Sequence, residues 1–308
     1  MPNDFKFLMI GAMYENGGNT THRFLDGHPQ MFVYPFESQI GTSMVQDHLS
    51  SMFPLKYRWP VFALDATPQQ DYRAIIDEEG KVRARTPNVS KFRHMPFDFS
   101  DDERRDIYLK YVTASGRSRA NNVAAFFQAT FDAWKDYKRT NKEQVYVGYS
   151  PIITIDADKI LSDLPGAHVL HVVRNPWSAY ADTKKRPMPL SLHHYMTGWT
   201  LNQYHALLFR EKFPGHVHIV RAEDVMADAY QSLAPICIAL GLEPADTLKK
   251  PTWNGQQLEE IYPWGTIRSA TPEANLATAN ELSDGEKAEI KSYTWQYLDI
   301  LRYRNIIE

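Results

Sequence analysis

The 308-residue sequence is poor in cysteine, in long apolar runs and in net charge. Its single cysteine, Cys237, excludes a disulfide framework, and because it lies in the apolar run 234–240 we expect it in the core of a protein from a reducing compartment. The longest early apolar stretch, residues 7–13, is too short for a membrane span and wrongly flanked for an export signal. We therefore expect a cytoplasmic protein with no integral membrane segment.

The charge is close to balanced, with a formal net charge of −3 and a pI near 6.4. This balance excludes an overall basic surface, so we do not expect nucleic acid as a partner, although it allows a local basic pocket for a small anion. We expect no metal site either. The adjacent residues His193 and His194 would diverge by about 100° on a helix, so they do not predict a shared ion.

Short apolar runs alternate with longer helical patterns, which is typical of strand-helix-strand units and a mainly parallel sheet. With 43% hydrophobic residues the chain is able to bury one large core, and we expect a single α/β domain over 1–308 in which helices flank a central sheet. The runs that we interpret as strands are Phe5–Gly11, Met31–Tyr34, Val145–Gly148, Ala167–Val173 and His216–Val220.

Two segments with apolar residues at three- and four-residue spacing predict helices that pack on this sheet, Asn121–Tyr137 and Ile155–Leu164. Residues 55–115 break the pattern with scattered prolines and charges, and Glu78-Glu79-Gly80-Lys81 indicates a turn. We interpret 55–115 as an insertion over one face of the sheet. Such insertions form lids or acceptor-binding walls in some α/β proteins and plain surface loops in others.

The first predicted strand continues into a glycine-containing turn and then a helix. Gly17 and Gly18 allow positive φ and close approach of a ligand, and Asn19 or Thr20 can cap the helix. The free amides of a first helical turn favour a phosphate or sulfate, although purely structural caps use the same residues. An ATP- or GTP-cleaving P-loop has a lysine directly after its second glycine, where this chain has Gly18, so that class is disfavoured.

Several segments, in this order, resemble the sulfotransferase superfamily that uses 3′-phosphoadenosine 5′-phosphosulfate. They are Gly18-Asn19-Thr20-Thr21, His28-Pro29, Glu37, Val172-Val173-Arg174-Asn175-Pro176 and Arg221-Ala222-Glu223-Asp224-Val225. The resemblance covers nearly the whole chain and implies a P-loop-like sulfotransferase fold of the bacterial or glycan-modifying type. It also implies which residues bind the 5′-phosphosulfate, namely Asn16, Gly17, Gly18, Asn19, Thr20 and Thr21.

The same resemblance implies that Arg174 binds the 3′-phosphate of the donor. Arg174 follows a parallel strand at the end where open α/β sheets bind ligands, and its planar fork suits phosphate, although an isolated arginine there is more often a salt-bridge partner. Eight residues later the family has a serine, whereas this chain has Asp182, an acid that would repel phosphate. We therefore assign that part of the site to Ser178, or to Thr183 if the helix register differs.

Two further segments have implied roles. We interpret Arg221–Val225 as mainly structural, with its carboxylates capping the next helix and pairing with nearby bases. In the loop before the last helix, Gly265, Thr266 and Arg268 are implied to close over the adenosine bisphosphate, with Trp264 as an apolar wall for the adenine. A packed aromatic turn is the alternative for that loop.

Sulfuryl transfer requires positioning, electrostatic stabilisation and a base for the acceptor hydroxyl. The resemblance implies Glu37, after the second strand, as that base, and a structural helix cap is the alternative. Relatives carry a lysine or arginine just before the Gly-Thr-Thr-like turn, where this chain has Glu15 and Asn16. The transition-state cation must then come from elsewhere, and His22 and Arg23 are the candidates.

The sequence thus predicts transfer of a sulfuryl group from 3′-phosphoadenosine 5′-phosphosulfate to a hydroxyl acceptor, a small molecule or a glycan, with a sugar as the first choice. The missing cation leaves a second class open, a catalytically weakened nucleotide-binding or regulatory protein of the same fold. A small-molecule kinase is disfavoured, because the turn lacks a Walker-type lysine and magnesium ligands.

Overall fold

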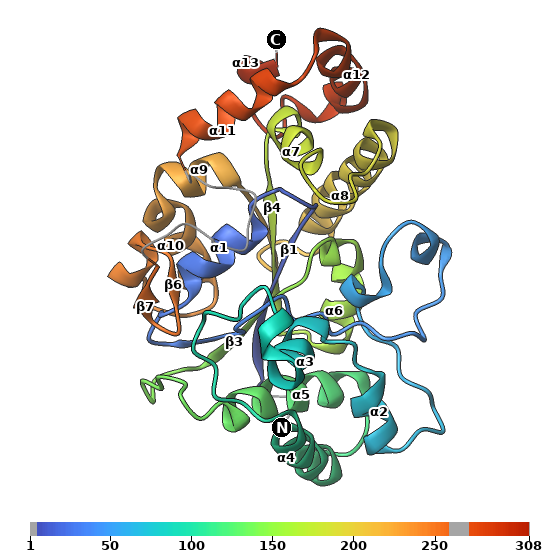
Figure 1. Ribbon diagram of the computed structural model, residues 1–308, viewed down its shortest axis with the longest axis vertical. Helices are drawn as coiled ribbons and strands as arrows, with labels where there is room; N and C mark the ends of the chain where they lie inside the picture. The colour runs from blue at the N-terminus through green and yellow to red at the C-terminus, as the bar shows by residue number, and fades with distance from the viewer. Residues whose placement is uncertain (1–4, 259–270, 308) are drawn as a thin grey trace.

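A parallel sheet forms the centre of the structure, a computed structural model that describes residues 5–258 and 271–307 (Figure 1). The strand order is β2-β3-β1-β4-β5, and each neighbouring pair is parallel. The bounds are β1 (Lys6–Ala12), β2 (Met31–Val33), β3 (Val145–Tyr149), β4 (His168–Val173) and β5 (Val217–Arg221). The predicted α/β fold is confirmed, and each predicted strand is present with its ends shifted by at most one residue.

Helices cover the sheet and extend beyond it. In chain order they are α1 (Gly18–Leu25), α2 (Pro68–Ala74), α3 (Glu78–Arg85), α4 (Asp101–Ser115), α5 (Arg119–Ala133), α6 (Ala157–Asp163), α7 (Pro176–Thr183), α8 (Leu192–Lys212), α9 (Ala222–Ala227), α10 (Ala229–Ala239), α11 (Pro272–Thr278), α12 (Asp284–Thr294) and α13 (Arg304–Ile307). A small antiparallel hairpin pairs β6 (Thr252–Trp253) with β7 (Gln256–Gln257). Short 3₁₀ helices occupy His48–Ser51, Leu55–Tyr57, Pro87–Val89, Ile153–Asp156, Asp246–Lys249, Ala279–Glu281 and Trp295–Tyr297.

The two faces of the sheet bury different sets of helices, as the alternation along β1 shows. Phe7 and Met9 belong to an apolar cluster with residues of α4, α5 and α6, whereas Leu8 and Ile10 pack with residues of α1, α9 and α10. The second cluster also contains Cys237, which is buried and free, as expected. Both faces are therefore covered, which is the arrangement that parallel strands require.

A third apolar cluster lies beside the carboxyl ends of the central strands. It contains Met13, which follows β1, and Val173, the last residue of β4, together with residues of α7, α8 and α12. These three helices lie together at the top of Figure 1, next to the C-terminal segment. The residues that leave the sheet are thus held between the core and a helical layer.

The helical predictions are confirmed with shifted bounds, since Asn121–Tyr137 corresponds to α5 and Ile155–Leu164 to a 3₁₀ turn followed by α6. The predicted turn at 78–81 is wrong, because these residues begin α3. Gly80 serves packing there, since a Cβ at this position would lie 2.5 Å from Asp77 Oδ2. The predicted insertion folds into α2, α3 and α4, and α4 packs along α5.

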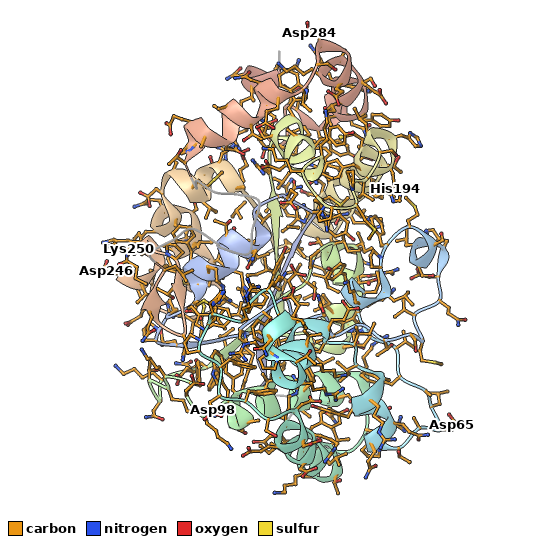
Figure 2. The ribbon with its side chains drawn as sticks, viewed as in Figure 1. Asp65, Asp98, His194, Asp246, Lys250 and Asp284 are labelled. Carbon is orange, nitrogen blue, oxygen red and sulfur yellow. The ribbon has the colours of Figure 1, made fainter. Side chains whose placement is uncertain are left out.

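In the part of the chain that the structure describes, no helix has the length and apolar character needed to cross a membrane. Over the same residues, no group of three or more histidine, cysteine, aspartate or glutamate side chains is arranged to hold a metal ion. His193 and His194 are both exposed, and Figure 2 shows His194 at the outer edge of the molecule, on α8.

Candidate active site

The turn after β1 lies at the point where the chain order of the sheet reverses. β1 has β3 on one side and β4 on the other, and in open α/β sheets ligands bind at the carboxyl ends of strands at such a point. Gly17 has φ +82, and a Cβ there would lie 2.8 Å from the Cβ of Ala222, so the position requires glycine. The local sequence therefore fixes this tight turn.

The helix that follows begins with amides that are available to an anion. Gly17 is the N-cap of α1, so the predicted cap by Asn19 or Thr20 is wrong, and this N-cap has no side chain to satisfy the first amides. The first helical hydrogen bond runs from Thr21 N to Gly17 O, at 2.9 Å, and the amides of residues 18–20 precede it. These three amides and the positive end of the helix dipole suit a phosphate or sulfate.

Asn16 connects this turn to two other elements. Its side chain is 1% exposed, and its Nδ2 donates to Tyr14 O at 2.8 Å and to the Tyr195 hydroxyl of α8 at 2.9 Å. Its Oδ1 accepts from Arg174 N at 3.0 Å, directly after β4. A buried amide thus ties the turn to β4, in the place where the relatives carry a cation.

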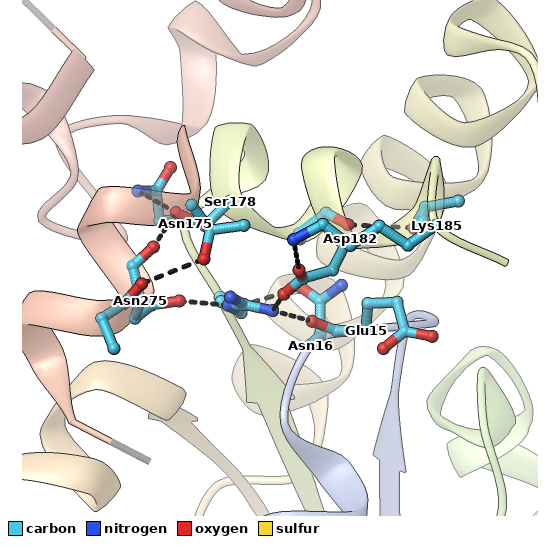
Figure 3. A network of polar contacts seen from close by, with 12 residues as sticks. Glu15, Asn16, Asn175, Ser178, Asp182, Lys185 and Asn275 are labelled. Carbon is cyan, nitrogen blue, oxygen red and sulfur yellow. Dashed lines mark hydrogen bonds and ion pairs between the residues drawn. The ribbon is translucent and has the colours of Figure 1, made fainter. Parts of the chain in front are cut away.

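Arg174 is buried, and its guanidinium is held by Glu15, Asp182 and Asn275, which Figure 3 labels. Its Nη1 donates to Glu15 O at 2.9 Å and to Asp182 Oδ2 at 2.7 Å, and its Nε donates to Asn275 Oδ1. Asp182, whose other oxygen lies 3.0 Å from Lys185 Nζ, therefore neutralises the arginine that sequence reasoning assigned to phosphate. A phosphate at Arg174 has to displace part of this network.

Ser178, the third residue of α7, lies in the same network. Its hydroxyl donates to Asn275 O at 2.5 Å and accepts from Asn175 Nδ2 at 3.1 Å. Thr183, the other candidate, donates to Ala179 O at 2.9 Å within the helix. The structure therefore brings Arg174 and Ser178 together around Asn275 of α11, a residue that no sequence motif marked.

Glu223 connects the end of β4 to the C-terminal helices. Its carboxylate accepts from Asn175 N at 2.8 Å, from Asn275 Nδ2 at 3.0 Å and from the Tyr303 hydroxyl at 2.9 Å. It does not cap α10, because Asp228 does so. The expected pairing with a base is present, since Arg221 Nε lies 3.9 Å from both Glu223 Oε2 and Asp224 Oδ2. Glu223 also contacts α11 and Tyr303.

His22 and Arg23 lie on α1, and their side chains contact each other in the protein interior. His22 is fully buried and Arg23 is 1% exposed, with 2.9 Å between Arg23 Nη2 and His22 Nδ1. The guanidinium donates to Tyr34 O at 3.0 Å and lies 5.2 Å from the ring centroid of Trp253. Burial, and then the charge of Arg23, hold the pKa of His22 well below its usual value, so this imidazole is neutral.

A different cation lies beside the turn. The Nε of Arg186 is 4.0 Å from Glu15 Oε1, and its guanidinium carbon is 4.8 Å from the ring centroid of Tyr14. The Arg186 side chain is 35% exposed, unlike that of Arg23. Sequence reasoning missed it because no motif includes it.

Glu37 lies at the opposite side of the site, in a cluster with Glu79 of α3. Lys91 Nζ lies 3.6 Å from Glu37 Oε1 and contacts Glu79 Oε1, and Glu79 Oε2 accepts from Glu37 N at 3.1 Å. Burial, reinforced by the charge of Glu37, raises the pKa of Glu79 to about 8. Residues 37–42 form no helix, so Glu37 does not act as the structural helix cap that was the alternative.

Buried charges fix α3 and α4 to the end of β2, and thereby place Glu79. Arg104 of α4 is fully buried, with Nη1 2.7 Å from Asp77 Oδ2 and Nη2 2.7 Å from Asp101 Oδ1. Asp77 is the N-cap of α3 and accepts from the hydroxyl of Tyr34, which follows β2, at 3.0 Å. The predicted insertion is therefore attached to the sheet at the site.

Tyr149 lies against the turn and within range of the charges of the carboxylate cluster. Gly18 packs against Tyr149, since a Cβ at that glycine would lie 2.5 Å from the tyrosine ring. Burial raises the pKa of Tyr149 well above its usual value, and the nearby charges of Glu37, Glu15 and Glu79 reinforce the shift. The turn and the carboxylates are thus parts of one site, whereas Gly265, Thr266, Arg268 and Trp264 lie outside the described residues.

The fold and this site define an α/β protein with an anion-binding turn at the reversal point of a parallel sheet. The model of the sulfotransferase family matches residues 9–246, and the chain belongs to that family. The superfamily that the motifs resemble is thereby confirmed.

One solved structure shows the same fold at low identity, and a second is similar over most of the chain. The sulfotransferase domain from the Synechococcus PCC 7002 olefin synthase has a TM-score of 0.50 and 14% identity, over 95% of this chain and 94% of that domain. The sulfotransferase domain from the curacin biosynthetic pathway has a TM-score of 0.48 and 12% identity, over 94% of this chain and 96% of that domain. Among curated proteins, no sequence matches the chain significantly.

Proposed function

We propose that this sulfotransferase takes its sulfuryl group from 3′-phosphoadenosine 5′-phosphosulfate and transfers it to a hydroxyl acceptor, without a metal ion. The observation that carries the proposal is the run of amides at residues 18–20, which follows the glycine turn at the reversal point of the sheet. These amides suit the 5′-phosphosulfate by charge and by geometry. The family membership and the fold support the same reaction class.

The remaining donor contacts belong to the proposal. Arg174 and Ser178 both contact Asn275, and Arg174 also pairs with Asp182. The two residues bind the 3′-phosphate when part of these contacts is broken. A doubly charged phosphate competes well with one carboxylate for a guanidinium, because it offers more acceptor oxygens. Gly265, Thr266 and Arg268 are assigned to the bisphosphate by resemblance alone.

In the chemical step, Glu37 acts as the base and Arg186 as the cation near the leaving group. Glu37 takes the proton of the acceptor hydroxyl as that oxygen bonds to sulfur, and the bond from sulfur to the 5′-phosphate oxygen breaks. Adenosine 3′,5′-bisphosphate is then the leaving group. Arg186, whose guanidinium is partly exposed beside the turn, supplies positive charge for the leaving oxygens, in the role for which His22 and Arg23 are too deeply buried.

The acceptor class remains part of the proposal. The resemblance implies that some glycan-modifying relatives use a glutamate base, so a sugar hydroxyl is our first choice of acceptor. Tyr14, whose ring lies 6.0 Å from that of Tyr57, offers an aromatic surface on which a sugar ring can stack.

A second candidate function is donor binding without turnover. Two acids stand where the relatives have a cation and a serine, Glu15 at the turn and Asp182 beside Arg174. Both weaken the field that stabilises a transferring sulfuryl group.

One assay separates the two candidates. Purified protein is incubated with 3′-phosphoadenosine 5′-phosphosulfate and a sugar, a phenol or a fatty alcohol, and the release of adenosine 3′,5′-bisphosphate is followed. Release that depends on one acceptor supports the sulfotransferase. Tight donor binding with no release for any acceptor favours the second candidate.

A further inference from the structure

The carboxylate of Glu79 has no role in the reaction as proposed, yet it is held against the base. It reaches Glu37 from α3, more than forty residues further along the chain. Gln39 supports both acids, because its Nε2 donates to Glu37 Oε2 at 3.4 Å and its Oε1 accepts from Glu79 N at 3.3 Å. Gln39 has a φ of +40, a left-handed backbone that the surrounding contacts must stabilise.

We propose that Glu79 is a positioning residue that shares one proton with Glu37, so that the two carboxylates, bridged by Lys91, act as a single proton acceptor for the acceptor hydroxyl. This inference rests on the proposed function. Glu79 acts through Glu37, which is the group that meets the hydroxyl. In the resting pair one carboxyl is protonated. The pair first releases this proton to water, and the doubly ionised pair then removes the proton of the acceptor hydroxyl and keeps it until it exchanges with water.

The charges around the pair explain why it holds a proton. Two carboxylates face one ammonium, that of Lys91. Within the described part of the chain, Tyr57 and Tyr149 also lie near both acids, and Tyr14 lies near Glu37. Like charges at such proximity do not both ionise easily, and burial adds to the cost. Such a pair titrates as a unit, and the pKa of Glu79 near 8 agrees with this behaviour.

This arrangement gives the predicted insertion a function. A lone glutamate beside a lysine is a weak base, because the ammonium stabilises its ionised form. A second carboxylate offsets the ammonium and makes the pair a stronger base near neutral pH. The helix α3 therefore brings a second acid to the end of β2, and the insertion is part of the reaction site.

The pair is tested directly by following the glutamate side-chain carboxyl carbons by NMR, in protein labelled with carbon-13 at that position. The native protein is expected to show a glutamate signal with a midpoint near pH 8. Glu79→Gln should remove this high-pH titration, and Lys91→Met should move it to higher pH. Glu78→Gln is the matched control, since Glu78 is the exposed neighbour that pairs with Lys56, and it should leave the signal unchanged.

The catalytic consequence is tested by the pH dependence of adenosine 3′,5′-bisphosphate release with a responsive acceptor. Glu79→Gln should move the acidic limb of the profile to lower pH and lower the plateau, because the remaining base is weaker. A purely structural role would instead lower the rate by the same factor at every pH.

The two proposals fail in different ways. If the native protein neither binds the donor nor releases the bisphosphate, the proposed function is wrong, whatever the NMR titration shows. If the native protein turns over, but all of its glutamates titrate near the usual value of about 4.3 or the high-pH signal survives in Glu79→Gln, the shared proton is wrong and the sulfotransferase stands.

Discussion

The two sides of the site differ in how their charges are arranged. On the donor side, Arg174 is matched by Asp182 and by neutral oxygens, and Asn16 fixes the turn through buried hydrogen bonds. On the base side, Glu37 and Glu79 crowd around one ammonium. A buried network with balanced charges fixes the positions of its side chains. Two carboxylates that share one ammonium instead have a raised pKa, so their charge changes with pH. In the proposed reaction, the first network positions the donor and the second takes up the proton.

The largest expected effect comes from removing the base. Glu37→Gln should lower the rate of bisphosphate release by about 100- to 10,000-fold, as expected for loss of a positioned general base. Donor affinity, measured by calorimetry, should stay the same, because Glu37 lies on the other side of the site. The exposed control Glu78→Gln should keep full turnover, and a Glu37→Gln variant with native turnover would remove the assignment.

The next effect concerns the buried charges that place α3. Arg104→Met leaves Asp77 without its buried cation, which should cost about 3–5 kcal/mol of unfolding free energy. Chemical denaturation measures this loss. Arg105→Met is the matched control one residue away, on the exposed face of α4, and should unfold like the native protein. Equal stability of the two variants would show that α3 is not held through Arg104.

The donor side responds to the loss of Arg174. Arg174→Ala should weaken binding of adenosine 3′,5′-bisphosphate by about 1.5–3 kcal/mol, the usual worth of a hydrogen bond to a charged group. Titration calorimetry measures it, with Arg210→Ala as an exposed control.

Asp182 sharpens this test, because it competes with phosphate for Arg174. Asp182→Asn should strengthen binding of the bisphosphate and leave AMP binding almost unchanged, since AMP has no 3′-phosphate. If Arg174→Ala costs nothing and Asp182→Asn gains nothing, the 3′-phosphate binds elsewhere.

The smallest expected effect is on stability as a function of pH. The pKa of Glu79 is raised above its unfolded value, so between about pH 4.5 and pH 8 the folded protein binds more protons than the unfolded chain, and this group makes folding less favourable as pH rises. Between pH 5 and pH 8.5, the melting temperature of Glu79→Gln should therefore fall by a few degrees less than that of the native protein. If the melting temperatures of the two proteins changed with pH by the same amount, the raised pKa of Glu79 would be contradicted.

The sequence predicts the features that depend on neighbouring residues, and it does not predict those that depend on tertiary packing. The strands are short apolar runs, and the turn is specified by Gly17, which no other residue replaces at φ +82. The start of α3 was missed because Gly80 in a charged tetrapeptide indicates a turn, whereas here it accommodates the Asp77 carboxylate. Local patterns do not reveal such tertiary packing.

The residues that complete the site were out of reach for the same reason. Asn275 and Glu79 come from segments far from the motifs, and Arg186 follows α7 without belonging to a motif. Only the packing of these segments brings the three residues close to Arg174, Glu37 and Glu15. The burial of Arg23 is not visible in the sequence either, because one of the contacts that hold it comes from Trp253 in a distant hairpin.

The measurement that tests the central claim most directly is calorimetric titration of the native protein with adenosine 3′,5′-bisphosphate, with AMP and ATP as controls. The proposed donor site predicts that the bisphosphate binds tightly and that AMP binds at least tenfold more weakly, because the 3′-phosphate contact is worth about 1.5–3 kcal/mol. Absence of binding, or a preference for ATP, would contradict the assignment of the turn and of Arg174 to this donor.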